Sequence, residues 1–200
     1  MTNSKKIRLV KENDYISLLE IYGPFVRDTS VSFEYVVPTI DEFKKRINNI
    51  SKIFPWLVCE VNGKVVGYAY ASKHRERAAY QWSVDVSIYV APEYHRNYIA
   101  KALYTALIKI LRAQGYFNAY AIVALPNEKS EGFHKALGFV PIGVYHNVGY
   151  KFDKWHDVKC FELKISEHFL QPKSPKPITE ICETKEFNEI LDNAADLIKL

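Results

Sequence analysis

The chain has 200 residues, of which 48% are hydrophobic and 25% charged, and its net charge is +4. These values are typical of a soluble globular protein with one main domain. No run of about 18 apolar residues occurs, which excludes a membrane-spanning helix, and no dense basic run with interleaved aromatics supports a nucleic-acid partner. The three cysteines are isolated, so we expect neither a disulfide framework nor a metal site. The polar N-terminal segment lacks the apolar stretch of a signal peptide, so we expect a cytoplasmic protein.

The first half of the chain predicts one strand, two helices and a β-hairpin. Leu18 and Tyr22 recur at helical spacing in the first helix. Thr39 with Glu42 forms a capping box that marks the start of the second helix. Asn62-Gly63 tolerates the positive φ of a tight turn and therefore predicts the hairpin. The expected elements are a strand at Lys6–Val10, helices at Asp14–Phe25 and after Thr39, and strands at Trp56–Val61 and Val65–Tyr70.

The second half alternates strands and helices. Gly115 and Gly138 each stand where a predicted helix should stop. A strand–helix–strand unit predicts a parallel pair joined by a right-handed crossover, whereas the hairpin predicts antiparallel neighbours. The fold class is therefore α/β, with a mixed sheet and helices on both faces. The expected elements are strands at Gln81–Val90, Asn118–Val123, Phe139–Val144 and Val158–Ile165, and helices at Tyr98–Gln114 and Lys129–Leu137.

The C-terminal part reads as an appendage to a body formed by residues 1–165. Gln171–Pro177 contains three prolines, so residues 166–184 are predicted to be an extended linker. Residues 185–200 then form a short amphipathic helical tail. This tail is expected to pack on the body or on a second subunit, and a regulatory or partner-binding role is the less favoured alternative.

A polar loop leads from a strand into a long helix at His95–Lys101. Helix N-termini present unpaired backbone N–H groups and partial positive charge, which suit phosphate groups. Arg96 and Lys101 add full positive charges there, and Asn97 is a possible N-cap. The body is also more basic than the acidic tail, which favours an anionic ligand. The alternative is a basic helix start without any ligand.

The sequence resembles the GNAT superfamily of acetyltransferases and, within it, the phosphinothricin and methionine-sulfone N-acetyltransferases. The family's phosphate loop, Gln/Arg-x-x-Gly-x-Gly/Ala, matches His95–Ala100, in which Ala100 fits and His95 and Tyr98 depart from the pattern. The resemblance covers about Ile7–Ile165 and leaves the tail outside. It is carried most strongly by the segments Trp82–Val90, Ala113–Tyr116, Leu125–Asn127, Phe133–Phe139 and Gly149–Val158.

The resemblance implies a GNAT fold, acetyl-CoA as co-substrate without a metal, and a homodimer. Acetyl-CoA is expected where two central parallel strands diverge. Backbone groups there would hold the thioester carbonyl and the pantetheine arm, and the phosphate loop would hold the pyrophosphate. Asn127 would bind the CoA arm or cap the following helix. The implied cofactor-binding residues are Ile88, Tyr89, Val90, His95, Arg96, Asn97, Tyr98, Ile99, Ala100, Lys101 and Asn127.

Two residues are implied to be catalytic. Asp85 matches a Glu that serves the family as general base, and its shorter side chain suggests a bridging water. Its alternative is a carboxylate that only binds substrate or an ion partner. His134 stands where the family has a proton donor for the CoA thiolate. Its alternative is a hydrogen-bonded structural histidine.

Arg75 matches a family arginine and is implied to hold a substrate carboxylate, which a guanidinium binds through two hydrogen bonds. Its alternative is an exposed arginine beside Lys73 and Arg77. Phe33 and Trp155 are the predicted pocket walls, and their alternative is packing in the core. The expected reaction is acetylation of a small amino-acid-like amine. Two alternatives stay open: another amine acceptor, such as a peptide N-terminus, a polyamine or an aminoglycoside, or a non-catalytic acyl-CoA-binding regulatory module.

Overall fold

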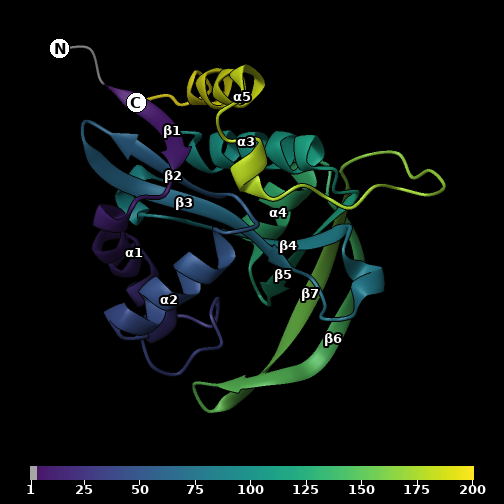
Figure 1. The fold of residues 1–200 in the computed structure, drawn as a ribbon. Coiled ribbons are helices and arrows are strands. Elements are labelled where there is room, and N and C mark those ends of the chain that lie inside the picture. Colours follow the sequence, from purple (N-terminus) through teal and green to yellow (C-terminus); the bar gives the residue numbers. More distant parts are fainter. Residues whose placement is uncertain (1–3) are drawn as a thin grey trace.

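The structure is a computed structural model that describes residues 4–200. Its helices and strands can be followed in chain order by colour (Figure 1). They are β1 (Lys5–Leu9), α1 (Tyr15–Asp28), α2 (Ile40–Ile50), β2 (Trp56–Val61), β3 (Lys64–Lys73), β4 (Ser83–Val90), α3 (Ile99–Gln114), β5 (Asn118–Ala124), α4 (Glu128–Ala136), β6 (Val140–Lys151), β7 (Lys154–Lys164) and α5 (Lys185–Ala195).

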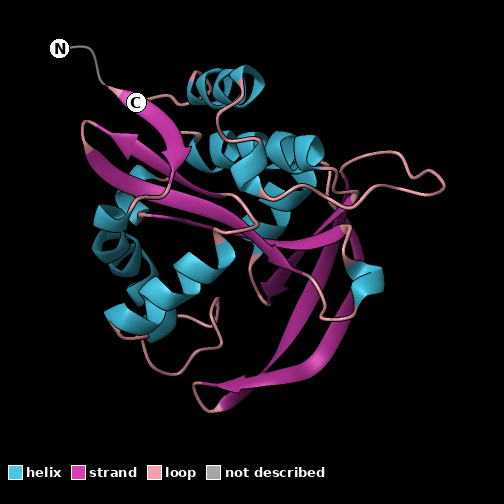
Figure 2. Cartoon of the chain, in the orientation of Figure 1, coloured by secondary structure: helices cyan, strands magenta, loops and turns pink. Residues whose placement is uncertain are grey.

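The strands form one mixed sheet of seven, which confirms the predicted α/β fold (Figure 2). The strand order is β1-β2-β3-β4-β5-β7-β6. The β4–β5 pair is parallel and connected through α3, whereas the other neighbouring pairs are antiparallel. Helices α1 and α2 lie on one face of the sheet, and α3 and α5 lie on the other (Figure 1).

Each face of the sheet buries its own hydrophobic core. Leu103, Leu107 and Ile110 of α3 are fully buried in the larger core, which also includes the apolar face of α5. The smaller core joins Leu18 of α1 and Phe43 of α2 to the aromatic side chains of β2 and β3. These helices therefore cover the β1–β4 half of the sheet.

The local signals in the sequence correspond to observed turns and caps. Thr39 Oγ1 accepts from the Glu42 N–H at 3.3 Å, and Glu42 Oε2 accepts from the Thr39 N–H at 2.8 Å, which confirms the capping box. Asn62 and Gly63 have φ of 50° and 80°, as the predicted hairpin turn requires. Gly115 ends α3 with φ of 97°, the left-handed conformation that favours glycine.

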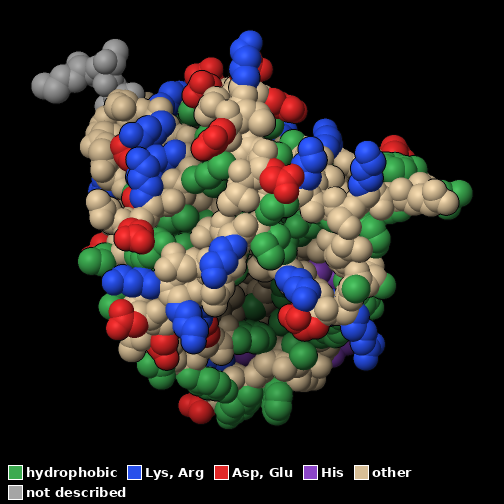
Figure 3. Space-filling model, viewed as in Figure 1, with side chains coloured by type: hydrophobic (Ala, Val, Ile, Leu, Met, Phe, Trp, Pro, Cys, Tyr) green, Lys and Arg blue, Asp and Glu red, His purple; other side chains and the backbone are tan. Residues whose placement is uncertain are grey.

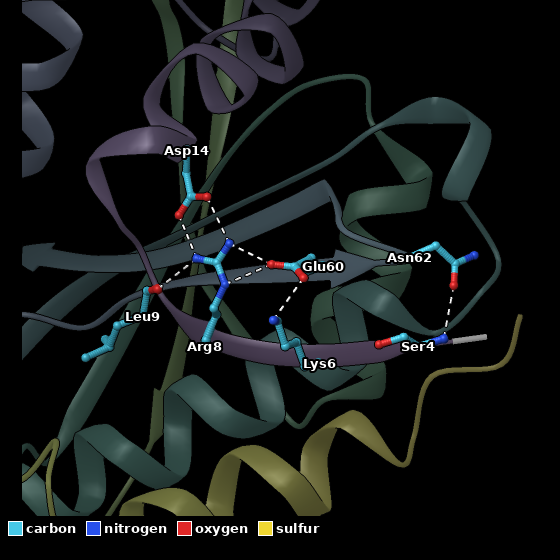
Figure 4. Close-up of polar contacts among 7 residues, drawn as sticks. All are labelled: Ser4, Lys6, Arg8, Leu9, Asp14, Glu60 and Asn62. Atoms are coloured by element: carbon cyan, nitrogen blue, oxygen red, sulfur yellow. Dashed lines mark hydrogen bonds and ion pairs between the residues drawn. The ribbon is translucent and has the colours of Figure 1, made fainter. Parts of the chain in front are cut away.

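A salt-bridge network ties the start of α1 to β1 and β2 (Figure 4). The Arg8 guanidinium donates to both carboxylate oxygens of Asp14, at 2.6 and 2.9 Å, and to Glu60 at 2.8 Å. Lys6 pairs with the other oxygen of Glu60 at 2.9 Å. Burial raises the pKa of Asp14, but the hydrogen bonds and positive charges of Arg8 and Lys11 together outweigh it and hold that pKa below its ordinary value.

A buried lysine fixes the segment that follows α1. Lys151, near the end of β6, is only 2% exposed, and its ammonium donates to three backbone carbonyls. The acceptors are Val26, Thr29 and Ser32, at 2.6, 2.8 and 2.7 Å. The last carbonyls of a helix lack intrahelical partners and favour a nearby cation, so Lys151 completes the C-terminal end of α1.

Packing fastens the same loop to the β6–β7 hairpin. Phe33 lies against Gly149 so closely that a Cβ at Gly149 would be 2.0 Å from the ring. The Phe33 ring also contacts His156, with centroids 6.0 Å apart. Tyr35 donates its hydroxyl proton to the carbonyl of Tyr150. The loop between α1 and α2 is thus held in place by residues more than a hundred positions away.

Three element boundaries differ clearly from the sequence-based expectation. The β6–β7 hairpin is much longer than predicted, and Phe152 and Asp153 form its turn with φ of 52° and 56°. Register shifts interrupt its ladder, which weakens the alternation that identifies strands in a sequence. Helix α1 continues past Pro24 to Asp28, and α5 ends at Ala195 instead of residue 200.

The tail packs on the body, one of the two placements that the sequence left open. Its apolar side chains, including Phe187 and Ile190, belong to the same core as α3. The proline-rich segment before it is also attached, because the Gln114 side-chain amide donates to the carbonyls of Ile53 and Lys176 at 2.9 and 2.7 Å.

Candidate active site

The two central strands diverge at a defined point. Strands β4 and β5 pair at Ser83–Asn118, Val84–Ala119 and Asp85–Tyr120, and this register ends there. From Val86 to Val90, β4 keeps only its β3 partner in the described part of the chain. Backbone N–H and C=O groups that point toward β5 are therefore available to an extended ligand in the gap.

The face that carries α1 and α2 is open beside this gap. Ile122 lies on the central strand β5, yet its side chain is 51% exposed. A space-filling view of this side shows a hollow in the molecular surface, with lysine and arginine side chains around it (Figure 3). The divergence of the strands and this hollow together form a cleft over the middle of the sheet.

Asp85 stands at the point of divergence and is paired with His74. His74 Nδ1 lies 2.7 Å from Asp85 Oδ1, and because an ionised carboxylate only accepts, the imidazole donates. In a neutral imidazole, Nε2 then carries the lone pair. Burial raises the pKa of Asp85, and the His74 hydrogen bond acts against this rise. The two residues can therefore act together as a proton acceptor.

The His74 ring is held in place by aromatic stacking. It lies on the Tyr120 ring, with centroids 4.3 Å apart and planes inclined by 20°. The Tyr120 hydroxyl donates to Glu162 at 2.8 Å, and burial followed by this carboxylate raises the pKa of Tyr120 to about 12. Because Tyr120 keeps its proton and its partner, the imidazole rests on a fixed platform.

Arg75 lies next to this pair. Its guanidinium donates to the His74 carbonyl at 2.9 Å, and its side chain is exposed. Its positive charge is the smallest of the effects that lower the pKa of Asp85, after the hydrogen bond and the charge of His74. Arg75 is therefore connected to Asp85 through His74, which contacts both residues.

The predicted wall residues lie around the β6–β7 hairpin. A cavity of about 510 Å³ opens there, lined by the loop after α1, the end of β5 and the hairpin turn. Phe33 is 36% exposed and packs on the hairpin residue Gly149. Trp155 is 60% exposed, packs on Tyr150 at 5.3 Å and borders a second cavity of about 390 Å³.

His134 is surrounded by aromatic rings and is 4% exposed. Its neighbours are Tyr104, Phe139 and Phe161, with centroids 5.2 to 5.7 Å away. Its Nδ1 lies 2.8 Å from the Ser130 carbonyl, so Nδ1–H donates there. Its Nε2 has no hydrogen-bond partner among the described residues, and burial lowers the pKa of the ring. These observations favour a neutral imidazole.

Asn127 caps α4, one of the two roles that the sequence allowed. Its side-chain oxygen accepts from the Ser130 N–H at 3.1 Å. The residue also lines the 510 Å³ cavity. On β4, the side chains of Tyr89 and Val90 pack into the two cores, so only backbone groups of this segment are available to a ligand in the gap.

The phosphate loop has an unusual backbone. Arg96 and Tyr98 have φ of 70° and 60°, which non-glycine residues rarely adopt. Tyr98 is therefore the left-handed N-cap of α3 and not its first helical residue, as the sequence had suggested. A glycine at this position of the family pattern is explained by this conformation. His95 Nε2 bonds the Val90 carbonyl at 3.1 Å, and Ile99 is buried in the core.

His74 is the site residue that sequence reasoning missed. It stands in a run of charged residues, which reads as an exposed loop. The β3–β4 register pairs Ser72 with Asp85, and this register alone brings His74 next to the carboxylate. An antiparallel alignment of the predicted strands Val65–Tyr70 and Gln81–Val90 would have been the available signal.

Residues 4–200 contain neither a cluster of possible metal ligands nor a membrane-spanning helix. No group of three or more His, Cys, Asp or Glu side chains there is arranged to hold a metal ion. None of the helices in that range is both long and apolar enough to cross a membrane.

Comparison with known proteins identifies the family. Residues 7–159 match the model of the acetyltransferase (GNAT) domain. Phosphinothricin N-acetyltransferase from Streptomyces viridochromogenes is 32% identical over 178 residues, 89% of this chain and 95% of that protein. The L-methionine sulfoximine/L-methionine sulfone acetyltransferase from Salmonella typhimurium is 29% identical over 163 residues, 81% of this chain and 95% of that protein.

Solved structures agree. The GNAT superfamily phosphinothricin acetyltransferase from Sinorhizobium meliloti, in complex with AcCoA, superimposes with a TM-score of 0.81 at 31% identity, covering 86% of this chain and 94% of that one. A match of 178 residues must also reach residue 178 or beyond, so the similarity extends past Ile165, where the sequence analysis had ended it. The chain is an acetyltransferase and belongs to the GNAT family.

Proposed function

We propose that the chain transfers the acetyl group of acetyl-CoA to the amine of a small amino-acid-like acceptor, of the phosphinothricin or methionine sulfoximine type. The observation that carries this proposal is the Asp85–His74 pair at the divergence of β4 and β5, with the Arg75 guanidinium beside it. A proton acceptor and a carboxylate-binding cation then face one reaction site. The names of the relatives support the same class of acceptor.

The reaction needs a deprotonated amine. Asp85, through His74, takes a proton from the acceptor's ammonium, and the amine nitrogen then attacks the thioester carbonyl. The C–N bond forms, the C–S bond breaks, and the leaving CoA thiolate takes up the second proton, which the attacking nitrogen gives up as the amide forms. His74 occupies the space that the shorter Asp side chain leaves, so it replaces the bridging water expected from the sequence.

The remaining site residues bind the two substrates. The backbone of Ile88, Tyr89 and Val90 holds the thioester carbonyl and pantetheine arm in the gap, and His95–Lys101 holds the pyrophosphate. Arg75 binds the acceptor's carboxylate through two hydrogen bonds. Trp155 forms a wall of the 390 Å³ cavity, and Phe33 packs on the hairpin that borders both cavities.

For His134 we propose the structural alternative. A neutral ring whose one proton is donated to the Ser130 carbonyl has no proton for the CoA thiolate. Replacing His134 with Gln should reduce thermal stability more than it changes the pH dependence of kcat. If the decline of kcat at alkaline pH were present in wild type and absent from the Gln variant, His134 would be the proton donor after all.

The leading test is release of CoA thiol from acetyl-CoA, with phosphinothricin, methionine sulfoximine, methionine sulfone, spermidine and a peptide panel as acceptors. Turnover with the first three supports the proposal. Turnover only with spermidine or with peptides would mean that the acceptor is a polyamine or a peptide N-terminus. Acetyl-CoA binding without turnover on any amine supports the non-catalytic module.

Variants test the roles at the same site. Asp85→Asn should lower kcat by about 10²- to 10⁴-fold, the usual contribution of a general base. Asp153→Asn, at an exposed hairpin turn, is the matched control. His74→Phe keeps the stack on Tyr120 and removes the ring nitrogens, so it should also lose turnover. Normal kcat in His74→Phe would leave Asp85 to act alone.

The fall of activity at acidic pH should reflect the raised pKa of Asp85. Because burial raises the pKa of Asp85, its ionised, proton-accepting form is lost at a higher pH than in an exposed aspartate. The kcat/KM for the amine should therefore fall on acidification, with its midpoint above the ordinary value of 3.8. A limb that is unchanged in Asp85→Asn would assign the titration to another group.

Arg75 is tested through the acceptor. Arg75→Ala should raise the KM of a carboxylate-bearing amine by about 10-fold or more, since a hydrogen bond to a charged group contributes about 1.5–3 kcal/mol. The neighbouring Arg77→Ala serves as the control. Equal KM values for wild type and Arg75→Ala would remove Arg75 from the acceptor site.

We further propose a cytoplasmic homodimer in which residues 1–165 form the catalytic body. Strand β6 is an edge strand and exposes a row of apolar side chains, among them Val140, Ile142 and Val144. A long apolar edge invites pairing with another chain, here a second copy. Light scattering tests this directly, and Val144→Lys should give monomers if β6 forms the interface.

A further inference from the structure

The last residues of the chain contact the phosphate loop. The Lys199 N–H donates to the Asn97 carbonyl at 3.1 Å. The Lys199 ammonium lies 4.8 Å from the centre of the Tyr98 ring, within the range of a cation–π contact. Two bonds of different kind therefore connect the end of the tail to consecutive loop residues about a hundred positions earlier.

This end of the tail is itself anchored. The Lys5 ammonium donates to the Ile198 carbonyl at 2.6 Å, and the Ile198 side chain is 2% exposed. Helix α5 packs against α3 and β1, beside which it lies in Figure 1. Lys199 is thus presented by a fixed support, and its contacts with the loop follow from the packing of α5.

The loop requires such support because its backbone is strained. Arg96 and Tyr98 both have positive φ without being glycine, and such residues persist only where the surroundings hold them. The tail bonds the peptide between them and the ring of the second strained residue. The tail therefore contacts the strained part of the loop directly.

The hydrogen bond also sets the direction of a donor. In a trans peptide, the C=O of one residue and the N–H of the next point to opposite sides. Because the Asn97 carbonyl is turned toward Lys199, the Tyr98 N–H is turned away from the tail. Backbone N–H groups at the start of α3 are the donors that a pyrophosphate would use.

We propose that Lys199 is a positioning residue for the phosphate loop and holds the Asn97–Tyr98 peptide in its acetyl-CoA-binding orientation. The Tyr98 ring accordingly serves as a contact for the Lys199 ammonium on the tail side of the loop. This inference rests on the proposed function, in which His95–Lys101 binds the pyrophosphate.

Two variants separate the two contacts. Lys199→Ala removes the ammonium and keeps the backbone bond, so the Kd for acetyl-CoA should rise about 2- to 5-fold, the contribution of one exposed cation–π contact. A chain that ends at Ile198 loses both contacts, and its Kd should rise about 10-fold. Lys199→Arg should restore near-normal binding, because arginine makes the same ring contact.

The matched control is Lys185→Ala at the start of α5, the helix that precedes Lys199; this lysine pairs with Glu189 in an exposed i,i+4 contact. Its acetyl-CoA affinity should equal that of wild type. Calorimetry gives the Kd of the full-length protein for acetyl-CoA, and steady-state kinetics give both KM values and kcat. The expected pattern is a raised KM for acetyl-CoA, with the KM for the amine and the kcat unchanged.

A double-mutant cycle tests the strain argument. Tyr98→Ala and Tyr98→Gly both remove the ring contact, but only the glycine relieves the left-handed strain, so truncation after Ile198 should weaken acetyl-CoA binding less in the glycine background than in the alanine background. Equal losses in both backgrounds would overturn the positioning role. So would unchanged acetyl-CoA affinity in the truncated chain, or a change confined to the KM of the amine. Absence of acetyl-CoA binding in wild type would instead overturn the proposed function itself.

Discussion

Lys151→Met is the substitution that should reveal how the α1–α2 loop is held. The change keeps most of the side-chain volume and removes an ammonium that bonds the carbonyls of Val26, Thr29 and Ser32. Each buried carbonyl left without its partner costs about 1–3 kcal/mol, and the wild-type ammonium already bears its own burial cost. The net loss of unfolding free energy should be about 3 kcal/mol.

For a chain of this length, about 3 kcal/mol corresponds to a fall in Tm of about 6–12 °C. Differential scanning calorimetry measures it, with Lys45→Met at an exposed position of α2 as control. Because Thr29 and its neighbours line the 510 Å³ cavity, the KM of the amine should rise as well. A Tm that stays within about 2 °C of wild type would refute the reasoning, since it would mean that water replaces the ammonium without loss.

Two further outcomes follow from the packing and from the salt-bridge network. Gly149→Ala places a methyl group 2.0 Å from the Phe33 ring, so the ring must move. The expected result is a raised KM for the amine and a small loss of Tm. An unchanged KM would exclude Phe33 from the acceptor site. Asp14→Asn removes a carboxylate whose pKa is held low by Arg8, so it should destabilise the protein by about 1.5–3 kcal/mol at pH 7. The difference in unfolding free energy between wild type and Asp14→Asn should shrink as the pH falls below the ordinary aspartate pKa of 3.8 and through the lower pKa of the folded state. Urea unfolding at several pH values would measure it. A difference that stays constant with pH would contradict the assignment.

Helix caps and tight turns could be predicted from the sequence because they depend on residues that are close together in it. The Thr39–Glu42 capping box and the Asn62-Gly63 turn depend on residues within three positions of each other, and both are observed. The parallel strand pair around α3 also follows from element order alone. The family motif at Trp82–Val90 then located the Asp85 carboxylate at the divergence of two strands.

Features that depend on distant residues could not be predicted. His74 meets Asp85 only through the β3–β4 register, and Lys151 acts on carbonyls about 120 positions earlier. Tyr98 was expected in the helix because tyrosine rarely adopts the left-handed conformation, and the glycine of the family pattern at this position was the one signal of it. Its conformation is supported by Lys199, at the opposite end of the chain. Long-range contacts of this kind leave no periodic pattern in a sequence.

The packing of α5 has a consequence for the order of events during synthesis. A nascent chain emerges from the ribosome with its N-terminal end first, so α5 becomes available after all seven strands of the sheet. While α5 is still inside the ribosome, the side of α3 and β1 that it covers lacks this partner. The start of α3 therefore gains its contact with Lys199 only after α5 has emerged, and a chain that stalls before this point would expose an apolar surface.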